Sequence, residues 1–453
     1  MPGRTLSSRD DKHGPLPSRR RAEQVRGSPP PPGGWDGGLS KATRTKAEVQ
    51  PGGEATFGAT HNEGAGTMPA TPSVPAARML DFGELAPKFT LPVLDGTSTY
   101  IFDSAAGRPI VLLFLGSANW APCAAALALV RRNAALFDDE RACFFGVTVD
   151  RNDVAEKRIA TRIPGIRWFL DYEMRVSREY QAARGDGTRA NYAPHWLLLD
   201  RTMRVMMREP IDQGERIFAG LRAMIAAGEE ENHAPVLIAP RILEPELCQE
   251  LIRRYEAHGG TESGFMRTDA NGKTIAVYDQ RYKRRSDYQI DDPQLRALLL
   301  DRLRRRLVPQ MVRAFNYQPT RIERWMVACY DAEQGGFFRP HRDNTTAGTA
   351  HRVFACTINL NAEAFEGGEL RFPEYGQRSY RAPTGGAVIF GCGLLHEALP
   401  VTKGRRYAFL PFFYDEEKAL LRERNQVHMA DTSANYRANL PPLAAAPKDG
   451  SEA

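Results

Sequence analysis

The sequence is poor in cysteine and has no long apolar segment. Its six cysteines in 453 residues are too few for a disulfide scaffold and suit a reducing compartment. No apolar run reaches the roughly 20 residues of a membrane-spanning helix, and the N-terminus lacks the apolar core of a signal peptide. Because 42% of the residues are hydrophobic, a wholly disordered chain is excluded as well. We therefore expect a cytoplasmic protein without a membrane partner.

Net charge is also low, and most of it lies at one end of the chain. The 61 Lys and Arg exceed the 55 Asp and Glu by six, and residues 1–78 hold eleven basic against seven acidic residues, which is four of those six charges. This stretch is rich in glycine and proline and buries too little apolar surface to offset chain entropy. We expect residues 1–80 to be a disordered tail, or the product of a start codon assigned too early, with translation beginning at Met68 or Met79. No nucleic-acid partner is expected.

Residues 81–229 predict one small α/β domain. Short apolar segments that suit buried strands alternate with stretches of helical period, and the last two strands form a hairpin followed by a helix. Strands separated by helices pair in parallel, so a small mixed sheet is expected. The expected strands lie at 108–116, 143–150, 195–200 and 203–209, and the expected helices at 122–137, 153–162 and 214–227.

The charged segment 228–235 predicts a linker, and a second domain is expected over 235–416. Helices come first, at 246–258 and from Pro293 to Phe315. From Arg324 to Tyr414, short apolar strands are separated by Gly, Pro and Asn, which is typical of an all-β sandwich or barrel. Residues 417–453 are predicted to be a C-terminal tail.

A metal-binding pattern lies in the β-rich part of this second domain. His341 and Asp343 stand two residues apart in FFRPHRDN, and in an extended strand such residues project from the same face. His396 follows about fifty residues later, at the end of AVIFGCGLLH, a separation at which a jelly roll returns one strand beside another. Two imidazoles and one carboxylate form the facial triad that suits Fe(II) and leaves three positions open. A chelating 2-oxo acid would take two of them and dioxygen the third.

A chelating co-substrate with a distal carboxylate needs a buried cation, and the strand GRRYAFLPFF offers two. Arg406 shares its face with apolar residues suited to a barrel interior, so we choose Arg406 as the bidentate carboxylate anchor. Arg405 points to the opposite face and is expected in solvent.

Three segments of the second domain resemble the prolyl 4-hydroxylase family of Fe(II)- and 2-oxoglutarate-dependent oxygenases, notably its oxygen-sensing branch. They are WMVACYDAEQGGFFRPHRDN, INLNAEAFEGGELRFPE and APTGGAVIFGCGLLHEALPVTKGRRYAFLPFFYDE. The resemblance spans about residues 235–415 and implies a double-stranded β-helix (jelly-roll) core. It also implies that His341, Asp343 and His396 ligate iron, that Arg406 binds the 2-oxoglutarate carboxylate, and that L-ascorbate is an accessory.

Two further positions of the co-substrate site follow from the same resemblance. Tyr330 matches an active-site tyrosine of the oxygen-sensing branch, and packing in the core is the alternative for this side chain. Asn359 stands where the family often has a tyrosine that touches the co-substrate. An amide still donates a hydrogen bond, but over a shorter reach, so this departure bears on co-substrate affinity more than on co-substrate identity.

Cys123 is the candidate redox residue of the first domain. It follows an apolar strand and opens a helix in LFLGSANWAPCAAAL, where the helix N-terminus would stabilise its thiolate. The surrounding sequence resembles the peroxiredoxin and thioredoxin superfamily over about residues 82–228, which implies a thioredoxin-like fold with Pro194 as its cis-proline. Trp120 replaces the Thr or Ser of peroxiredoxins, and no Cys-x-x-Cys is present. A degenerate domain that docks partners or substrate is therefore favoured over an active thiol peroxidase.

The favoured hypothesis is a thioredoxin-like domain followed by an Fe(II)/2-oxoglutarate dioxygenase. The enzyme would hydroxylate an unactivated C–H bond while 2-oxoglutarate is decarboxylated to succinate. Its expected partners are dioxygen, 2-oxoglutarate and a protein or peptide substrate, with peptidyl proline as the family-level candidate. Two alternatives stay open: a thiol peroxidase that uses Cys123 and has a regulatory oxygenase-like domain, and a non-catalytic oxygen or iron sensor.

Substrate selection is predicted to lie within 260–290. Arg284 and Arg285 in KRRSDYQI are candidates for contact with a carboxylate-bearing target, although a solvated basic loop is the preferred interpretation. His351 is expected to be exposed. The cysteines outside the first domain are expected to behave as small core residues, namely Cys248, Cys329, Cys356 and Cys392.

Overall fold

The computed structural model describes residues 79–94, 99–185, 191–228, 232–269, 271–431 and 436–438. Almost all of the predicted N-terminal tail and the end of the predicted C-terminal tail lie outside the described residues. The described chain folds into two successive domains, and each is described by itself. No helix in the described part of the chain is long and apolar enough to cross a membrane.

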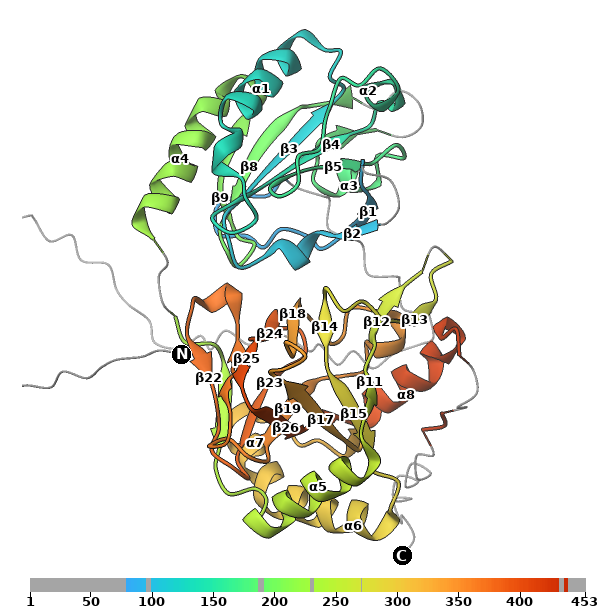
Figure 1. The fold of residues 1–453 in the computed structure, drawn as a ribbon. Coiled ribbons are helices and arrows are strands. Elements are labelled where there is room, and N and C mark those ends of the chain that lie inside the picture. The colour runs from blue at the N-terminus through green and yellow to red at the C-terminus, as the bar shows by residue number, and fades with distance from the viewer. Residues whose placement is uncertain are drawn as a thin grey trace, which may run out of the picture. The chain divides into compact units, whose positions relative to one another are not determined.

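The N-terminal domain is built on a five-stranded mixed sheet with the order β5-β4-β3-β8-β9 (Figure 1). The first three strands pair in parallel, and the last two join in antiparallel. The predicted mixed sheet is therefore confirmed. Its strands are β3 (Ile110–Gly116), β4 (Cys143–Thr148), β5 (Ile166–Leu170), β8 (His195–Leu199) and β9 (Val205–Pro210). Two small ribbons pair β1 (Thr90–Pro92) with β2 (Thr99–Ile101) and β6 (Ala183–Arg184) with β7 (Asn191–Tyr192).

Both faces of this sheet are covered, which explains why β3 is apolar at every position. Helices α1 (Ala121–Arg132) and α4 (Gly214–Ala227) pack together on one face, over Val111 and Trp196. The opposite face packs against Phe89, Phe102 and the short helix α3 (Arg175–Glu179). A further short helix, α2 (Arg151–Ala155), follows β4.

Three expectations for this domain are wrong. The strand β5 was not predicted from the sequence; it forms at the sheet edge because Trp168 and Phe169 pack on opposite faces of the sheet. The helix expected over 153–162 ends at Ala155. The cis peptide bond among the described residues joins Ile163 to Pro164, so Pro194 follows a trans bond.

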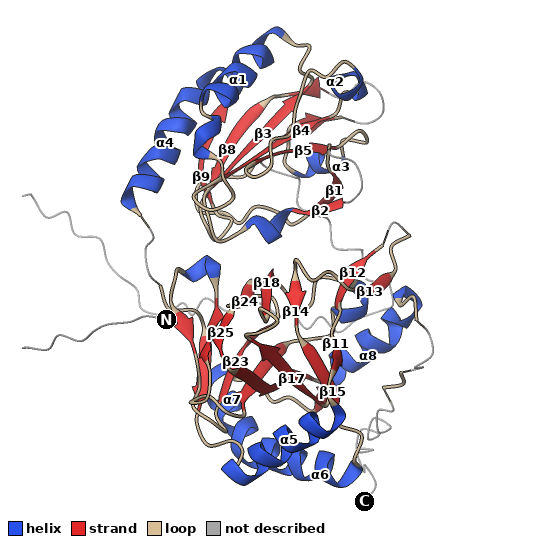
Figure 2. Cartoon of the chain, viewed as in Figure 1, coloured by secondary structure: helices blue, strands red, loops and turns tan. Residues whose placement is uncertain are grey.

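The second domain contains two larger antiparallel sheets (Figure 2). The nine-stranded sheet has the central path β10-β23-β19-β26-β17-β15-β11, with β16 and β27 attached, and the five-stranded sheet has the order β14-β18-β24-β21-β22. The strands of the larger sheet are β10 (Val236–Ala239), β11 (Thr261–Glu262), β15 (Ser286–Gln289), β16 (Arg321–Glu323), β17 (Met326–Asp331), β19 (Phe354–Asn359), β23 (Ala387–Gly391), β26 (Arg405–Phe409) and β27 (Phe412–Tyr414).

The remaining strands belong to the smaller sheet and to two ribbons. Those of the smaller sheet are β14 (Lys283–Arg284), β18 (Phe337–His341), β21 (Leu370–Arg371), β22 (Ser379–Tyr380) and β24 (His396–Ala398). The ribbons pair β12 (Phe265–Thr268) with β13 (Thr274–Val277), and β20 (Glu366–Gly367) with β25 (Val401–Lys403). The all-β core predicted from the sequence is confirmed.

Helices cover one face of the larger sheet. Helix α5 (Pro245–His258) begins at a proline and ends at Gly259, whose φ of +84° suits a glycine. Helix α6 (Pro293–Arg302), a π-helical turn and α7 (Val308–Phe315) form the helical stretch predicted from Pro293 to Phe315. Buried side chains of these helices, such as Leu251, pack against Ile358 and Phe409 of the sheet. The other face of the sheet is thereby left for the site described below.

Two local expectations for the second domain have different outcomes. All six cysteines are free and buried, as expected for the four of this domain. His351 is only 2% exposed, and its Nε2 lies 2.7 Å from a carboxylate oxygen of Glu323, so the expectation of an exposed histidine is wrong.

Beyond β27, helix α8 (Glu416–Arg424) begins where the Asp415 carboxylate accepts a hydrogen bond from the backbone of Lys418.

Replacement of Leu251 by alanine tests the packing between α5 and the sheet. Leu251 is fully buried, so Leu251→Ala should lower the free energy of unfolding by about 2–5 kcal/mol. Chemical denaturation of the full chain measures this change. Leu298 of α6 is 38% exposed, and Leu298→Ala is the matched control with an expected change below about 1 kcal/mol. Equal effects of the two substitutions would contradict this packing.

Candidate metal centre and co-substrate cavity

The smaller sheet brings the three predicted metal ligands together. His341 ends β18 and His396 begins β24, and the antiparallel register pairs these two residues directly. Asp343 follows two residues after His341, and its backbone N–H donates to the carbonyl of Cys392 at 3.0 Å. The Asp343 carboxylate lies 3.7 Å from Nε2 of His341 and 3.3 Å from Nε2 of His396. One ligand atom from each residue thus fits within a cluster 4.8 Å across.

Backbone carbonyls orient both imidazoles toward this cluster. Nδ1 of His341 lies 2.8 Å from the carbonyl of Arg339, and Nδ1 of His396 lies 3.0 Å from the carbonyl of Leu394. Each Nδ1–H donates to its carbonyl, which leaves each Nε2 lone pair for a metal. Burial, and then the neighbouring His396, hold the pKa of His341 well below its usual value. The neutral imidazole is the form that binds a metal, and this N₂O donor set fits Fe(II).

Arg406 lies in the same cavity as the three ligands, with its side chain on the inner face of the larger sheet. It is 3% exposed, and its Nη1 is buried without a hydrogen-bond partner. Burial lowers the pKa of Arg406. The side chain of Arg405 is 49% exposed and forms an ion pair with Asp331 at 2.8 Å. The predicted alternation of these two arginines is therefore found.

The two other predicted co-substrate residues lie in different surroundings. Tyr330 is 4% exposed, lines the cavity, and pairs with Arg406 across the strands β17 and β26. The guanidinium of Arg406 lies 5.1 Å from the centre of the Tyr330 ring. Asn359 is also buried, but its side-chain amide donates to the carbonyl of Ala382 at 2.7 Å, and it is not among the residues that line the cavity. A co-substrate role for Asn359 therefore has no support in this geometry.

The cavity includes two arginines that sequence reasoning did not place there. Arg285 is 8% exposed and lines the cavity, so the interpretation of a solvated basic loop is wrong for this residue, whereas Arg284 is exposed. Arg324, which lies between β16 and β17, was not considered as a site residue. A basic residue next to an apolar strand was the available signal, but strand pairing decides which basic residues face inward. The apolar lining includes Phe338, Phe390, Leu410 and Phe412.

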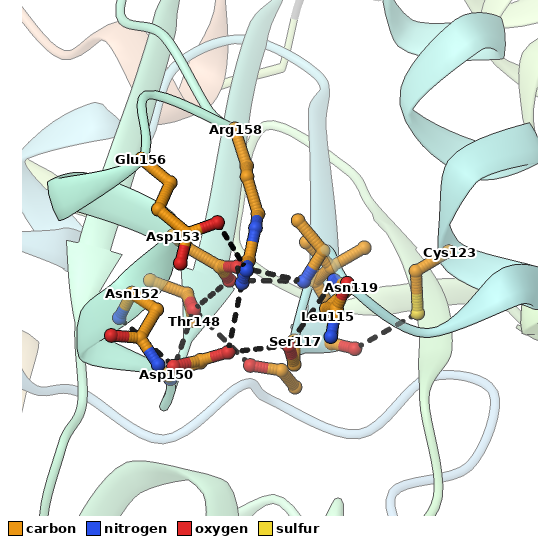
Figure 3. A network of polar contacts seen from close by, with 12 residues as sticks. Leu115, Ser117, Asn119, Cys123, Thr148, Asp150, Asn152, Asp153, Glu156 and Arg158 are labelled. Atoms are coloured by element: carbon orange, nitrogen blue, oxygen red, sulfur yellow. Dashed lines mark hydrogen bonds and ion pairs between the residues drawn. The ribbon is translucent and has the colours of Figure 1, made fainter.

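Cys123 of the N-terminal domain lies in the first turn of α1, and its side chain is buried. Its exposure is 0%, and its Sγ lies 3.3 Å from the carbonyl of Leu115, toward which it points in Figure 3. Burial, and then the charge of Asp153, raise the pKa of the Cys123 thiol to about 11. The expectation that the helix N-terminus would stabilise a thiolate is therefore wrong. Catalysis by Cys123 stays a prediction.

In the polar network beside Cys123, the charge that acts on the thiol is the carboxylate of Asp153. The carboxylate of Asp153 is fully buried and accepts hydrogen bonds from Thr148 at 2.6 Å and from the backbone of Ala118 at 3.0 Å (Figure 3). Arg158 reaches the same carboxylate at 3.4 Å. These contacts hold the turn between β3 and α1. They satisfy the buried carboxylate of Asp153, so a structural role accounts for its burial.

Comparison with known families agrees with both domains. A model of the 2OG-Fe(II) oxygenase superfamily matches residues 325–414, and a model of the AhpC/TSA family matches residues 82–207. A PKHD-type hydroxylase of Pseudomonas fluorescens is 32% identical over 170 residues, which are 35% of this chain and 70% of that protein. The chain belongs to the 2OG-Fe(II) oxygenase superfamily. Its N-terminal part is a redoxin domain related to the AhpC/TSA family.

Other relatives cover less of their own length or show weaker likeness. PKHD-type hydroxylases of two Synechococcus strains are 30% identical over 120 residues, so the chain spans about half (51%) of these curated relatives and they span 25% of it. The solved prolyl-4-hydroxylase of Pseudomonas putida has 21% identity and a TM-score of 0.31, covering 40% of this chain and 93% of its own. A peroxidoxin of Mycobacterium tuberculosis has 22% identity and a TM-score of 0.28, covering 32% and 98%.

Loss of the carboxylate ligand should abolish tight metal binding by the oxygenase domain. We expect Asp343→Ala to weaken Fe(II) binding by more than about tenfold, because second-sphere changes alone cost that much at metal sites. Anaerobic calorimetry on the full chain measures the affinity. Asp331→Asn is the control, since Asp331 is a buried carboxylate of β17 outside the triad. Unchanged affinity in Asp343→Ala would contradict the assignment of the triad.

The raised pKa of Cys123 in the redoxin domain predicts slow alkylation. With a pKa of about 11, about one thiol in ten thousand is ionised at pH 7, and the iodoacetamide rate should rise about tenfold per pH unit up to pH 10. Peptide mass spectrometry identifies the labelled residue, and the same chain unfolded in urea gives the rate of an accessible thiol. A rate that levels off below pH 8 would show an activated thiolate and would revive the thiol peroxidase hypothesis.

Proposed function

We propose that the chain is an Fe(II)- and 2-oxoglutarate-dependent hydroxylase that acts on an unactivated C–H bond, with peptidyl proline as the candidate target. The observation that carries this proposal is the buried, unpartnered Nη1 of Arg406 in the same cavity as the His341, Asp343 and His396 cluster. A buried guanidinium without a counter-ion costs folding free energy. Its retention beside a metal-binding cluster supports a carboxylate-bearing ligand at that place.

Each residue of the cavity has a distinct role in this proposal. His341, Asp343 and His396 hold the ferrous ion on one side and leave positions open on the other. Arg406 binds the distal carboxylate of 2-oxoglutarate, and Tyr330, whose ring lies beside Arg406, donates its hydroxyl to the same group. When bound, Fe(II) and 2-oxoglutarate supply the oxidation of a C–H bond with dioxygen, which yields succinate, carbon dioxide and the hydroxylated product.

The chain also shields this chemistry from water. Apolar side chains of the cavity lining include Phe390, Leu410 and Phe412. A dry wall strengthens the electrostatic contacts of Arg406 and limits side reactions. L-ascorbate is proposed as an accessory that keeps the iron reduced. The curated relatives are named hydroxylases, which supports hydroxylation.

For the redoxin domain we propose docking of a partner or substrate rather than peroxide reduction. Trp120 occupies the position where peroxiredoxins carry Thr or Ser, and its side chain packs edge-on against Tyr192. The thiol of Cys123 is buried and its pKa is raised. Both features disfavour attack on a peroxide, which needs an accessible thiolate.

The roles of the neighbouring arginines can be separated by substitution. Arg406→Ala should raise the 2-oxoglutarate concentration needed for half-maximal succinate formation by about tenfold or more, because a charge-assisted bidentate contact is lost. Arg405→Ala is the matched control, since Arg405 stands next in the same strand but faces outward. Succinate formed per enzyme, measured against 2-oxoglutarate concentration, gives the result.

A requirement for iron tests the proposed function. Succinate formation should require added Fe(II) and should disappear in His341→Ala. If wild-type turnover persisted after iron chelation, the proposed function would be wrong. If Arg405→Ala rather than Arg406→Ala raised the requirement for 2-oxoglutarate, the co-substrate would bind elsewhere.

A further inference from the structure

The cavity of the oxygenase domain holds more positive charge than its co-substrate uses. Among the described residues that line it, the ones with a formal charge are Asp343 and three arginines, Arg285, Arg324 and Arg406. In the proposed function, the ferrous ion, Asp343, doubly charged 2-oxoglutarate and Arg406 together are electrically neutral. The positive charges of Arg285 and Arg324 must then be balanced by other groups.

Arg285 is neutralised by Asp287, two residues further along the chain. Its Nε lies 2.7 Å from one oxygen of Asp287, and its Nη2 lies 2.8 Å from the other. This bidentate pair is buried on both sides, since the two side chains are 4% and 12% exposed. Arg285 therefore contributes no net charge to the cavity, and its Nη1 contacts the hydroxyl of Tyr330 at 3.5 Å.

Arg324 has no such partner. No described residue forms an ion pair or a hydrogen bond with its side chain, and its contact is with the ring of Phe412, whose centre lies 5.0 Å from the guanidinium carbon. The neighbouring Glu323 is engaged elsewhere, because both of its oxygens bind Arg352 at 2.7 and 3.0 Å. One of these oxygens also contacts His351. The acid next to Arg324 in the sequence is thus already paired.

Arg352, which is paired with Glu323, lies beside Arg324. The guanidinium carbon of Arg352 is 4.3 Å from the centre of the same Phe412 ring. Burial, and then the charge of Arg352, lower the pKa of Arg324 to about 10. Arg324 therefore stays charged at neutral pH in surroundings that disfavour its charge. An incoming anion would offset both the desolvation of the Arg324 charge and its repulsion by Arg352.

The backbone at Arg324 is also held in an uncommon conformation. Its φ is +67°, a region that residues other than glycine, asparagine and aspartate adopt rarely. The residue lies between β16 and β17, where the chain leaves one strand and enters the next. The side chain of Arg324 lines the cavity, whereas the side chain of the preceding Glu323 binds Arg352.

We propose that Arg324 binds a carboxylate of the substrate that is hydroxylated, so that the oxygenase site takes an anionic substrate in addition to 2-oxoglutarate. This inference rests on the proposed function. It deepens it by naming the class of substrate: a molecule with a carboxylate near the C–H bond that reacts. The carboxylate can belong to an acidic residue of a peptide or to a small molecule.

The test compares acids with their neutral amides. The full chain is loaded with Mn(II) and 2-oxoglutarate without dioxygen, so that Arg406 is occupied, and binding is measured by calorimetry. The small-molecule pair is N-acetyl-L-proline and N-acetyl-L-prolinamide. The peptide pair, blocked at both ends, is Ala-Pro-Asp and Ala-Pro-Asn. In at least one pair, the acid should bind about tenfold or more tightly than the amide, and the pair that shows this identifies the source of the carboxylate.

Three variants connect this preference to Arg324. Arg324→Asn removes the charge while keeping a residue that tolerates positive φ, and acid and amide should then bind equally. Arg324→Lys keeps the charge and should retain part of the preference. Arg241→Asn is the matched control, because Arg241 also has a positive φ of +61° but is exposed; it should retain the full preference.

The outcomes separate this inference from the proposed function. Equal or undetectable binding of acid and amide in both wild-type pairs would overturn the inference, and so would a preference that survives in Arg324→Asn. The same preparations, reloaded with Fe(II), are assayed for succinate. An enzyme that forms succinate but shows no acid preference loses this inference alone. An absence of succinate together with a clear acid preference would remove the proposed function and leave Arg324 as an anion-binding residue.

Discussion

The pairing of β18 with β24 is the constraint on which the metal centre depends. It sets His341 opposite His396, and the chain beyond β18 then needs only two residues to bring Asp343 between them. A slip of one residue would turn one imidazole to the opposite face of the sheet. The hydrogen bond from each Nδ1–H to a backbone carbonyl also fixes the rotation of each imidazole ring. Metal binding therefore depends on the register of these two strands.

The larger sheet supplies the complementary half of the site, and its main feature is buried positive charge. Its inner face and the strand entry before β17 carry Arg285, Arg406 and Arg324, which differ in how each charge is met. Arg285 is paired with Asp287, Arg406 faces the expected co-substrate, and Arg324 contacts an aromatic ring and forms no ion pair with a described residue. Because a buried charge without a counter-ion opposes folding, Arg406 points to a ligand rather than to stability, and we infer the same of the partly buried Arg324.

Local patterns predicted much of this architecture, and tertiary contacts decided the rest. A period of two separated Arg406 from Arg405, because strand alternation is a local property, whereas Asp343 lies beside His341 in a turn after β18 and not in the extended strand that was expected. The inward position of Arg324 and the burial of His351 depend on partners far away in the sequence, such as Phe412 and Glu323. The strand β5 escaped prediction for the same reason, since it is defined by pairing with β4. At Cys123, a correct local argument about a helix N-terminus was outweighed by burial and Asp153.

The two domains thus differ in how their candidate residues are prepared for chemistry. The oxygenase domain has two imidazoles, a carboxylate and an unpartnered guanidinium nitrogen in one cavity, whereas the thiol of the redoxin domain is buried and protonated. The central claim is that the first of these sites transfers oxygen to a substrate. Incubation of a cell extract with the full chain, Fe(II), 2-oxoglutarate and ¹⁸O₂, followed by mass spectrometry, tests it most directly. One heavy oxygen in a new product and one in succinate is the predicted result; products and succinate without the label would contradict it.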